Sequence, residues 1–222
     1  MSLSPDRSHE IARSDRRDAT IGITGDGFVL VAASSKLFRS ITVLRSDRNR
    51  TKALNSHNLM AISGSEGDCD AFGELIQANV QLYTMRNATD LGPHATASYV
   101  RGEIARGLRS RDSSAGYVNL LLAGYDTVHS RPKLYWMDYL GTMADVPYAA
   151  HGYTNYYVLS ILDKYHRRDI SLERAVEIMG LCTDEVRRRL PYDFGEFIVK
   201  VVDKDGIRDV PTDFGKRTVA IA

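Results

Sequence analysis

Short apolar runs dominate the first third of the chain and predict β-strands. Two of them, Thr20–Thr24 and Phe28–Ala32, flank the segment Gly25–Gly27, and an Asp-Gly pair between two β-prone runs is a strong hairpin signal. Phe28–Ala32 is apolar at every position, which predicts a strand buried on both faces. Two further strands are expected at Ile41–Leu44 and Leu59–Ile62, with polar, charged residues following the first of them.

Apolar residues recur at helical spacing in four later segments. These segments are Asp68–Met85, Ala95–Leu108, Tyr153–Tyr165 and Ser171–Leu190. In each of them the apolar positions gather on one side of a helix, as expected for a helix that packs against a core. Ser171 is a favourable N-cap residue, and Pro191 cannot continue the last helix.

The strands and helices come in blocks, which indicates the fold class. The remaining predicted strands are Tyr117–Ala123, Leu134–Met137, Phe197–Val202 and Ile207–Val210. Runs of strands followed by runs of helices are typical of an α+β domain rather than of alternating βαβ units. Because the strands are apolar on both faces, we expect two packed sheets with helices outside them.

A single domain is the simplest organisation for 222 residues. Residues 1–18 are polar and predict an N-terminal tail or leader, residues 19–210 form the domain, and residues 211–222 read as a C-terminal tail. The 43% hydrophobic and 26% charged residues are typical of a soluble globular protein. A net charge of +1 gives no field favouring nucleic acid or an anionic membrane.

Neither a membrane span nor a secretory signal is expected. No apolar run approaches the ~20 residues that cross a bilayer, and the first residues lack the apolar core of a signal peptide. An intracellular location follows as an expectation.

The sequence lacks the common motifs of metal sites, nucleotide-binding loops and catalytic nucleophiles. No two histidines lie three or four apart on a predicted helix, and Cys69 and Cys182 predict two buried, reduced thiols. The glycine-rich segment Gly22–Gly27 opens a strand, so it cannot serve as a dinucleotide-binding loop. Gly64–Gly67 precedes a helix and could bind an oxyanion, although a plain turn is the better interpretation. We therefore expect no cofactor and no metal.

Three tyrosines near the start of the third predicted helix indicate a binding surface. Tyr153, Tyr156 and Tyr157 cannot all face one core, and tyrosine is enriched at protein interfaces. The residue pattern alone therefore reaches a soluble α+β domain with a candidate assembly surface.

Eight stretches along the chain carry a family resemblance. They are Ile21–Ile23, Phe28–Ala32, Asn79–Asn87, Leu108–Arg111, Val118–Asp126, Met137–Tyr139, Ala149–Tyr153 and Leu159–Asp163. In this order they resemble the beta-type subunits of the eukaryotic 20S proteasome, most of all the non-catalytic beta-4 type. The resemblance implies a four-layer αββα sandwich, in which two antiparallel sheets are flanked by helix pairs, the N-terminal nucleophile hydrolase fold.

The resemblance also fixes where catalytic residues would stand. Active members of the family use an N-terminal threonine, an aspartate and a lysine that tune it, and a backbone amide in a glycine turn for the oxyanion. Matching Ile21–Ala33 to the family's first two strands places Asp18 at the nucleophile, Ser34 at the aspartate and Arg50 at the lysine. Only the turn glycine is retained, as Gly64.

These replacements predict a subunit without peptidase activity. Asp18 cannot act as an N-terminal hydroxyl nucleophile, Ser34 carries no charge, and Arg50 stays protonated. The expected function is structural: the chain helps to assemble the particle that degrades proteins in the ubiquitin–proteasome pathway. The subunit would not itself be an enzyme, although the complex around it is a threonine-type endopeptidase.

Two alternatives remain open at this point. If the match to the family's first two strands is shifted by two residues, Thr20 stands at the nucleophile position. Removal of residues 1–19 would then expose an active threonine. The chain could also be a stand-alone peptide-binding module.

The resemblance further implies partners and a location. The ring neighbours would be the beta-3 and beta-5 types, with further contacts to the facing beta ring and the outer alpha ring. Protein substrates would be met only in the assembled chamber, and the location would be cytoplasm and nucleus.

Overall fold

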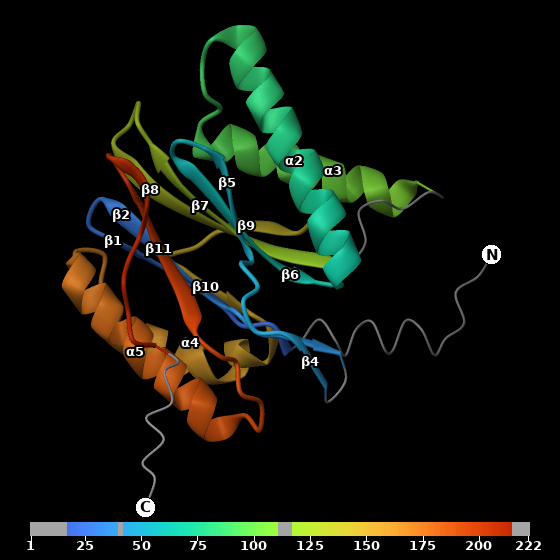
Figure 1. Ribbon diagram of the computed structural model, residues 1–222. Helices are drawn as coiled ribbons and strands as arrows, with labels where there is room; N and C mark the ends of the chain where they lie inside the picture. The colour runs from blue at the N-terminus through green and yellow to red at the C-terminus, as the bar shows by residue number, and fades with distance from the viewer. Residues whose placement is uncertain (1–16, 40–41, 111–116, 215–222) are drawn as a thin grey trace, which may run out of the picture.

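Two antiparallel sheets form the centre of the computed structural model, which describes residues 17–39, 42–110 and 117–214 (Figure 1). The first sheet has the order β10-β1-β2-β11-β12. Its strands are β1 Thr20–Gly25, β2 Phe28–Ser34, β10 Tyr148–His151, β11 Phe197–Asp203 and β12 Gly206–Asp209. Every pairing in this sheet is antiparallel.

The second sheet has the order β5-β6-β7-β8-β9 and is also antiparallel. Its strands are β5 Thr51–Asn55, β6 Asn58–Gly64, β7 Val118–Asp126, β8 Arg131–Met137 and β9 Met143–Asp145. A separate hairpin joins β3, Leu37–Arg39, to β4, Thr42–Arg45.

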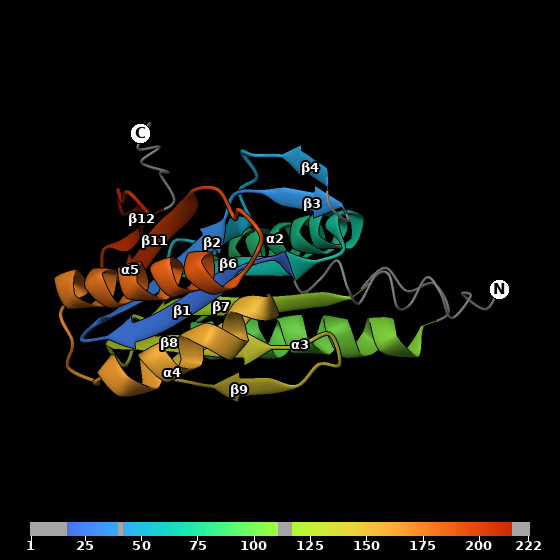
Figure 2. The ribbon, with the colours of Figure 1, turned by 90° about the horizontal axis from the view of Figure 1, so that it is seen from below.

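Helices cover the outer face of each sheet, as Figure 1 shows; in Figure 2, seen from below, α4 and α5 lie in front. On the second sheet lie α2, Glu66–Asn87, and α3, Pro93–Arg109. On the first sheet lie α4, Asn155–Tyr165, and α5, Leu172–Arg189. One 3-10 turn, η2 at Gly152–Thr154, leads into α4. The four layers confirm the predicted αββα sandwich.

Strand β2 shows how the sequence pattern builds these layers. All seven of its residues are buried, as its uniformly apolar sequence predicts. Phe28, Leu30 and Ala32 pack in the core beneath α4 and α5. Val29 and Val31 point the other way, into the core between the two sheets. The turn predicted at Gly25–Gly27 is confirmed at Asp26 and Gly27, whereas Gly25 is the last residue of β1. Gly27 has a φ of +74°, which favours glycine.

Some predicted boundaries were wrong or incomplete. The sequence reading missed the strands β3, β5, β9 and β10. Helix α2 begins at Glu66 rather than at Asp68, and the predicted helix Tyr153–Tyr165 begins as a 3-10 turn. The segment expected to be a C-terminal tail is partly packed, because Phe214 contacts the core beneath α5. The N-cap at Ser171 is confirmed, since its Oγ accepts a hydrogen bond from the Arg174 amide.

The domain limits stay predictions. Regular elements run from Thr20 to Asp209 in the described part of the chain, whereas residues 1–16 and 215–222 of the predicted tails lie outside it. None of the described helices is long and apolar enough to cross a membrane.

Candidate functional site

Asp18, Ser34, Arg50 and Gly64 lie together where strands of both sheets begin or end. Asp18 precedes β1 and Ser34 ends its partner β2, while Arg50 precedes β5 and Gly64 ends its partner β6. Antiparallel pairing brings the start of one strand beside the end of the next. All four positions expected from the family register are therefore neighbours in space.

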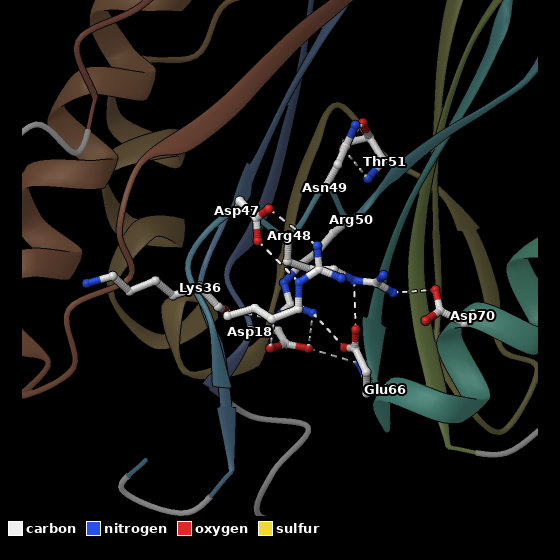
Figure 3. Close-up of polar contacts among 11 residues, drawn as sticks. Asp18, Lys36, Asp47, Arg48, Asn49, Arg50, Thr51, Glu66 and Asp70 are labelled. Carbon is white, nitrogen blue, oxygen red and sulfur yellow. Dashed lines mark hydrogen bonds and ion pairs between the residues drawn. The ribbon is translucent and has the colours of Figure 1, made fainter. Parts of the chain in front are cut away.

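An ion pair between Asp18 and Arg50 forms the centre of this site (Figure 3). Arg50 Nη2 lies 2.7 Å from Asp18 Oδ1, and Arg50 Nη1 donates to Asp18 Oδ2 at 3.0 Å. The Gly64 amide donates to the same Oδ2 at 3.2 Å, and the Lys36 carbonyl accepts from Arg50 Nη2 at 2.9 Å. Both charged side chains are almost completely buried.

Burial raises the pKa of Asp18 from 3.8 to about 6. The loss of hydration opposes the charged carboxylate, while the Arg50 guanidinium and then the Gly64 amide act in the other direction and favour it. At neutral pH the carboxylate is still mainly ionised, so the pair with Arg50 is intact.

Gly64 has the backbone conformation that aims its amide at the carboxylate. Its φ of +144° is a value that side-chain-bearing residues rarely adopt. A glycine at the junction of β6 and α2 is therefore required by geometry.

Ser34 binds backbone rather than a charged partner. Its Oγ accepts the Ala19 amide at 3.2 Å, and its own amide donates to the Ala19 carbonyl at 2.9 Å. The side chain is buried, so it fixes the segment that carries Asp18 without supplying an acid or a base.

A second layer of charges surrounds the central pair, and the sequence analysis missed it. Glu66 Oε1 lies 2.8 Å from Arg48 Nε, and Glu66 Oε2 lies 3.9 Å from Arg50 Nη1. Arg48 also pairs with Asp70. Charges thus alternate from Asp18 through both arginines to the first turns of α2 (Figure 3). Two features of the sequence could have indicated this second layer. Glu66 and Asp70 are four residues apart and share one face of α2, and Arg48 and Arg50 are two residues apart just before β5.

Thr20 stands apart from this cluster. It is the first residue of β1, where Ala33 is its neighbour on one side and His151 on the other. Its side chain is fully buried, and its Oγ1 has no hydrogen-bond partner among the described residues. The structure places Asp18, not Thr20, against Arg50 and Gly64.

The described residues include no group of three or more His, Cys, Asp or Glu side chains placed to hold a metal ion. Cys69 and Cys182 are both buried and unbridged, as expected from the sequence. Burial raises the pKa of the Cys182 thiol to about 12, which makes it a poor nucleophile.

Comparison with known proteins shows the family. A family model described as "Proteasome subunit" matches residues 17–202, so the chain belongs to the proteasome subunit family. It is 52% identical to "Probable proteasome subunit beta type-4" of Neurospora crassa over 199 residues, which covers 90% of this chain and 97% of the relative. It is 44% identical to "Proteasome subunit beta type-4" of Saccharomyces cerevisiae over 193 residues, covering 87% of this chain and 96% of the relative.

A plant relative is more distant. "Proteasome subunit beta type-2-A" of Arabidopsis thaliana is 41% identical over 192 residues, which covers 86% of this chain and 92% of the relative. The fungal matches confirm the resemblance to beta-type subunits and to type 4 in particular. They favour a structural subunit of the beta ring over an active threonine peptidase.

Proposed function

We propose that this chain is a structural, non-catalytic member of the 20S proteasome beta ring, because an internal ion pair occupies the positions where active members carry out catalysis. The observation that carries the proposal is the Asp18 carboxylate. It lies 3.2 Å from the Gly64 amide nitrogen, the amide that the family resemblance assigns to the oxyanion. A carboxylate of the chain itself already uses that hydrogen bond.

The chemistry of the neighbouring groups supports the same conclusion. A guanidinium is a poor proton acceptor, so Arg50 does not replace the lysine that active members of the family use. Ser34 holds the Ala19 backbone and contributes no charge. The site therefore binds and orients its own residues, and its carboxylate, Asp18, is already engaged by Arg50 and by the Gly64 amide.

The alternative in which Thr20 is the nucleophile has less support. Its hydroxyl is buried in a sheet between two strands and has no base within hydrogen-bond distance among the described residues. Freeing its amine would also remove Ala19, whose backbone makes two hydrogen bonds to Ser34.

Position in the particle is part of the proposal. We place the chain between beta-3-type and beta-5-type neighbours, with contacts to the facing beta ring and to the outer alpha ring. It would meet protein substrates only in the assembled chamber, and it would be found in cytoplasm and nucleus. The support is family membership together with the beta type-4 names of its fungal relatives.

Mass spectrometry of the N-terminus in purified particles tests this function. We expect a peptide that includes Asp18, alongside N-terminal threonine peptides from the active subunits of the same preparation as a control. A mature N-terminus at Thr20 would contradict the proposal. Gel filtration separates the third alternative, because a stand-alone module would elute near its 24.8 kDa mass rather than with a large particle.

A further inference from the structure

The turn between β5 and β6 carries a chain of polar contacts that reaches two other parts of the fold. Ser56 Oγ lies 2.7 Å from His57 Nδ1 and 2.8 Å from Asp90 Oδ2. His57 Nε2 lies 3.2 Å from the Lys204 carbonyl oxygen. Asp90 belongs to the connection between α2 and α3, and Lys204 belongs to the turn between β11 and β12. The serine and the histidine thus stand between the first sheet and the helices on the second sheet.

The number of available protons decides how many of these three contacts are hydrogen bonds. A carbonyl oxygen and an ionised carboxylate only accept, so the three contacts together need three protons. The Ser56 hydroxyl supplies one proton, and a neutral imidazole ring supplies one more. A protonated ring supplies two. Neutral His57 therefore leaves one contact without a proton, whereas protonated His57 completes all three.

The neutral ring has two tautomers, and each interrupts the chain at a different point. With its proton on Nε2, the ring donates to the Lys204 carbonyl, and the Ser56 hydroxyl then donates either to the ring or to Asp90. With its proton on Nδ1, the ring donates to Ser56, but its Nε2 and the Lys204 carbonyl oxygen face each other as two acceptors. Neither tautomer joins the Lys204 carbonyl to Asp90 in an unbroken chain.

The α2–α3 connection is positioned by further contacts that do not involve the histidine ring. Thr84 Oγ1, on α2, donates to Asp90 Oδ1 at 2.8 Å. Asn55 Nδ2 and Asn58 Nδ2 donate to the Leu91 carbonyl at 3.0 and 2.8 Å. Asp90 is therefore held beside the β5–β6 turn whatever the charge of the ring, and the ring adds or removes one further link.

Titratable groups surround His57 from three elements. The ring centroid of Tyr125, on β7, lies 6.5 Å from that of His57, and the Tyr125 amide donates to the His57 carbonyl at 3.0 Å. The charged groups on the neighbouring elements are Asp90, Asp126, Asp203, Lys204 and Asp205. Asp126 and Asp203 form ion pairs within their own hairpins. The carboxylate joined to the ring through Ser56 is therefore that of Asp90.

We propose that His57 is a proton-operated link between the first sheet and the α2–α3 connection. A protonated ring completes a chain of hydrogen bonds from the Lys204 carbonyl to Asp90, and a neutral ring interrupts it. Histidine changes its charge between about pH 5 and 8, so the connection is held more tightly at the acid end of this range. The inference does not depend on the proposed function, because all the atoms involved belong to this chain.

Hydrogen exchange of the full chain, measured at about pH 5.5 and about pH 7.5, tests the link. After correction for intrinsic exchange rates, amides of residues 84–96 should be protected about threefold more at the lower pH, as for one net hydrogen bond. His57→Gln and Ser56→Ala, both on a surface turn, should abolish this difference. The matched control His129→Gln changes an exposed histidine of the β7–β8 turn and should keep it.

Global effects of pH are separated from the link by a reference segment. Asp18, with a pKa of about 6, changes charge in the same range and acts on the whole fold. Residues 28–34 of β2 report that global contribution, which the His57→Gln and Ser56→Ala variants share with the wild type. A pH difference in residues 84–96 that persists in both variants, or that the wild type lacks, would overturn the proposal.

Asp90→Ala distinguishes proton counting from a merely structural role of the histidine. Without the carboxylate, two contacts remain, and the neutral ring together with the Ser56 hydroxyl supplies two protons. The chain from the Lys204 carbonyl to Ser56 is then complete at both pH values. We therefore expect residues 84–96 to exchange with equal protection at about pH 5.5 and about pH 7.5, although His57 is still present. A threefold difference that survives in Asp90→Ala would contradict the link.

Discussion

Asp18 and Arg50 form a two-pronged ion pair, with atoms 2.7 and 3.0 Å apart, at a point where neither side chain is more than 5% exposed. A buried charge without its partner is costly, so each residue depends on the other. The pair joins the segment before β1 in one sheet to the segment before β5 in the other. The ion pair thereby links the two sheets in this chain.

Removing one member of the pair should destabilise the fold more than removing both. Arg50→Met leaves the Asp18 carboxylate buried without its cation, and we expect a loss of about 3 kcal/mol in the free energy of unfolding. Asp18→Asn/Arg50→Met should recover more than half of that loss, because the asparagine side chain can still accept the Gly64 amide. Urea unfolding of the three chains measures this, and additive losses in the double variant would argue against coupling.

Asp18 should also give the stability of the fold a characteristic dependence on pH. Its pKa rises from 3.8 to about 6 on folding, chiefly through burial, so the folded chain holds this proton more tightly than the unfolded chain. The stabilising contribution of the group is therefore full below pH 3.8 and is lost as the pH rises through about 6. Urea unfolding midpoints of the wild type and of Asp18→Asn, measured between pH 3.8 and about 6, test this dependence. We expect the loss of stability with rising pH in the wild type and not in Asp18→Asn. Identical pH profiles of the two chains would count against the raised pKa of Asp18.

His151 should contribute in the opposite direction. It is buried, stacks on Trp136 at 5.2 Å between ring centroids, and its Nε2 lies 3.0 Å from the Leu120 carbonyl oxygen. Burial lowers its pKa from 6.5 to about 4, so its contribution is full above pH 6.5 and is lost as the pH falls toward 4. Acid titration of His151→Gln, followed by tryptophan fluorescence, should show a flatter loss of stability than the wild type; an unchanged slope would exclude the assignment.

Thr20 offers a test that separates structure from catalysis. Its Oγ1 is buried without a hydrogen-bond partner among the described residues, so Thr20→Val removes an unsatisfied polar atom at nearly constant volume. We expect about 1 kcal/mol of added stability and unchanged peptidase activities in the assembled particle. A nucleophile would behave differently, with one activity falling by a factor of ~10² or more.

The sequence was most informative where a single residue type decided the local structure. The apolar run of β2 and the Asp26-Gly27 turn were predicted from their composition alone. Strands β9 and β10, Met143–Asp145 and Tyr148–His151, contain no β-branched residue, and they are strands because β8 and β1 pair with them. Such tertiary pairing leaves no local signal.

The site was predictable only in part for a similar reason. The register expected from the resemblance singled out Asp18, Ser34, Arg50 and Gly64, which lie together in the structure. It could not show that the aspartate and the arginine would pair. The role of Glu66 depends on how α2 meets the segment before β5, which sequence spacing does not reveal. Contacts between distant segments require the fold.

The tyrosines that predicted an assembly surface now separate into two kinds. Tyr153 is partly buried and stacks on Tyr192, with ring centroids 6.5 Å apart and planes 13° from parallel. Tyr156 on α4 is 72% exposed. Tyr157 is partly buried as well. Tyr153 thus supports the fold, while Tyr156 presents an aromatic ring to solvent.

Single substitutions should therefore have distinct effects. Tyr153→Ser should destabilise the free chain by about 1 kcal/mol or more, since a stacked, partly buried ring is lost. Tyr156→Ser should leave the unfolding of the free chain unchanged, because its ring is mainly in solvent, and yet reduce the fraction of tagged chain that enters full particles. Native gels measure entry and urea unfolding measures stability. Normal entry of Tyr156→Ser would remove this tyrosine from the assembly surface, and a loss of stability in that variant would show that its ring supports the fold after all.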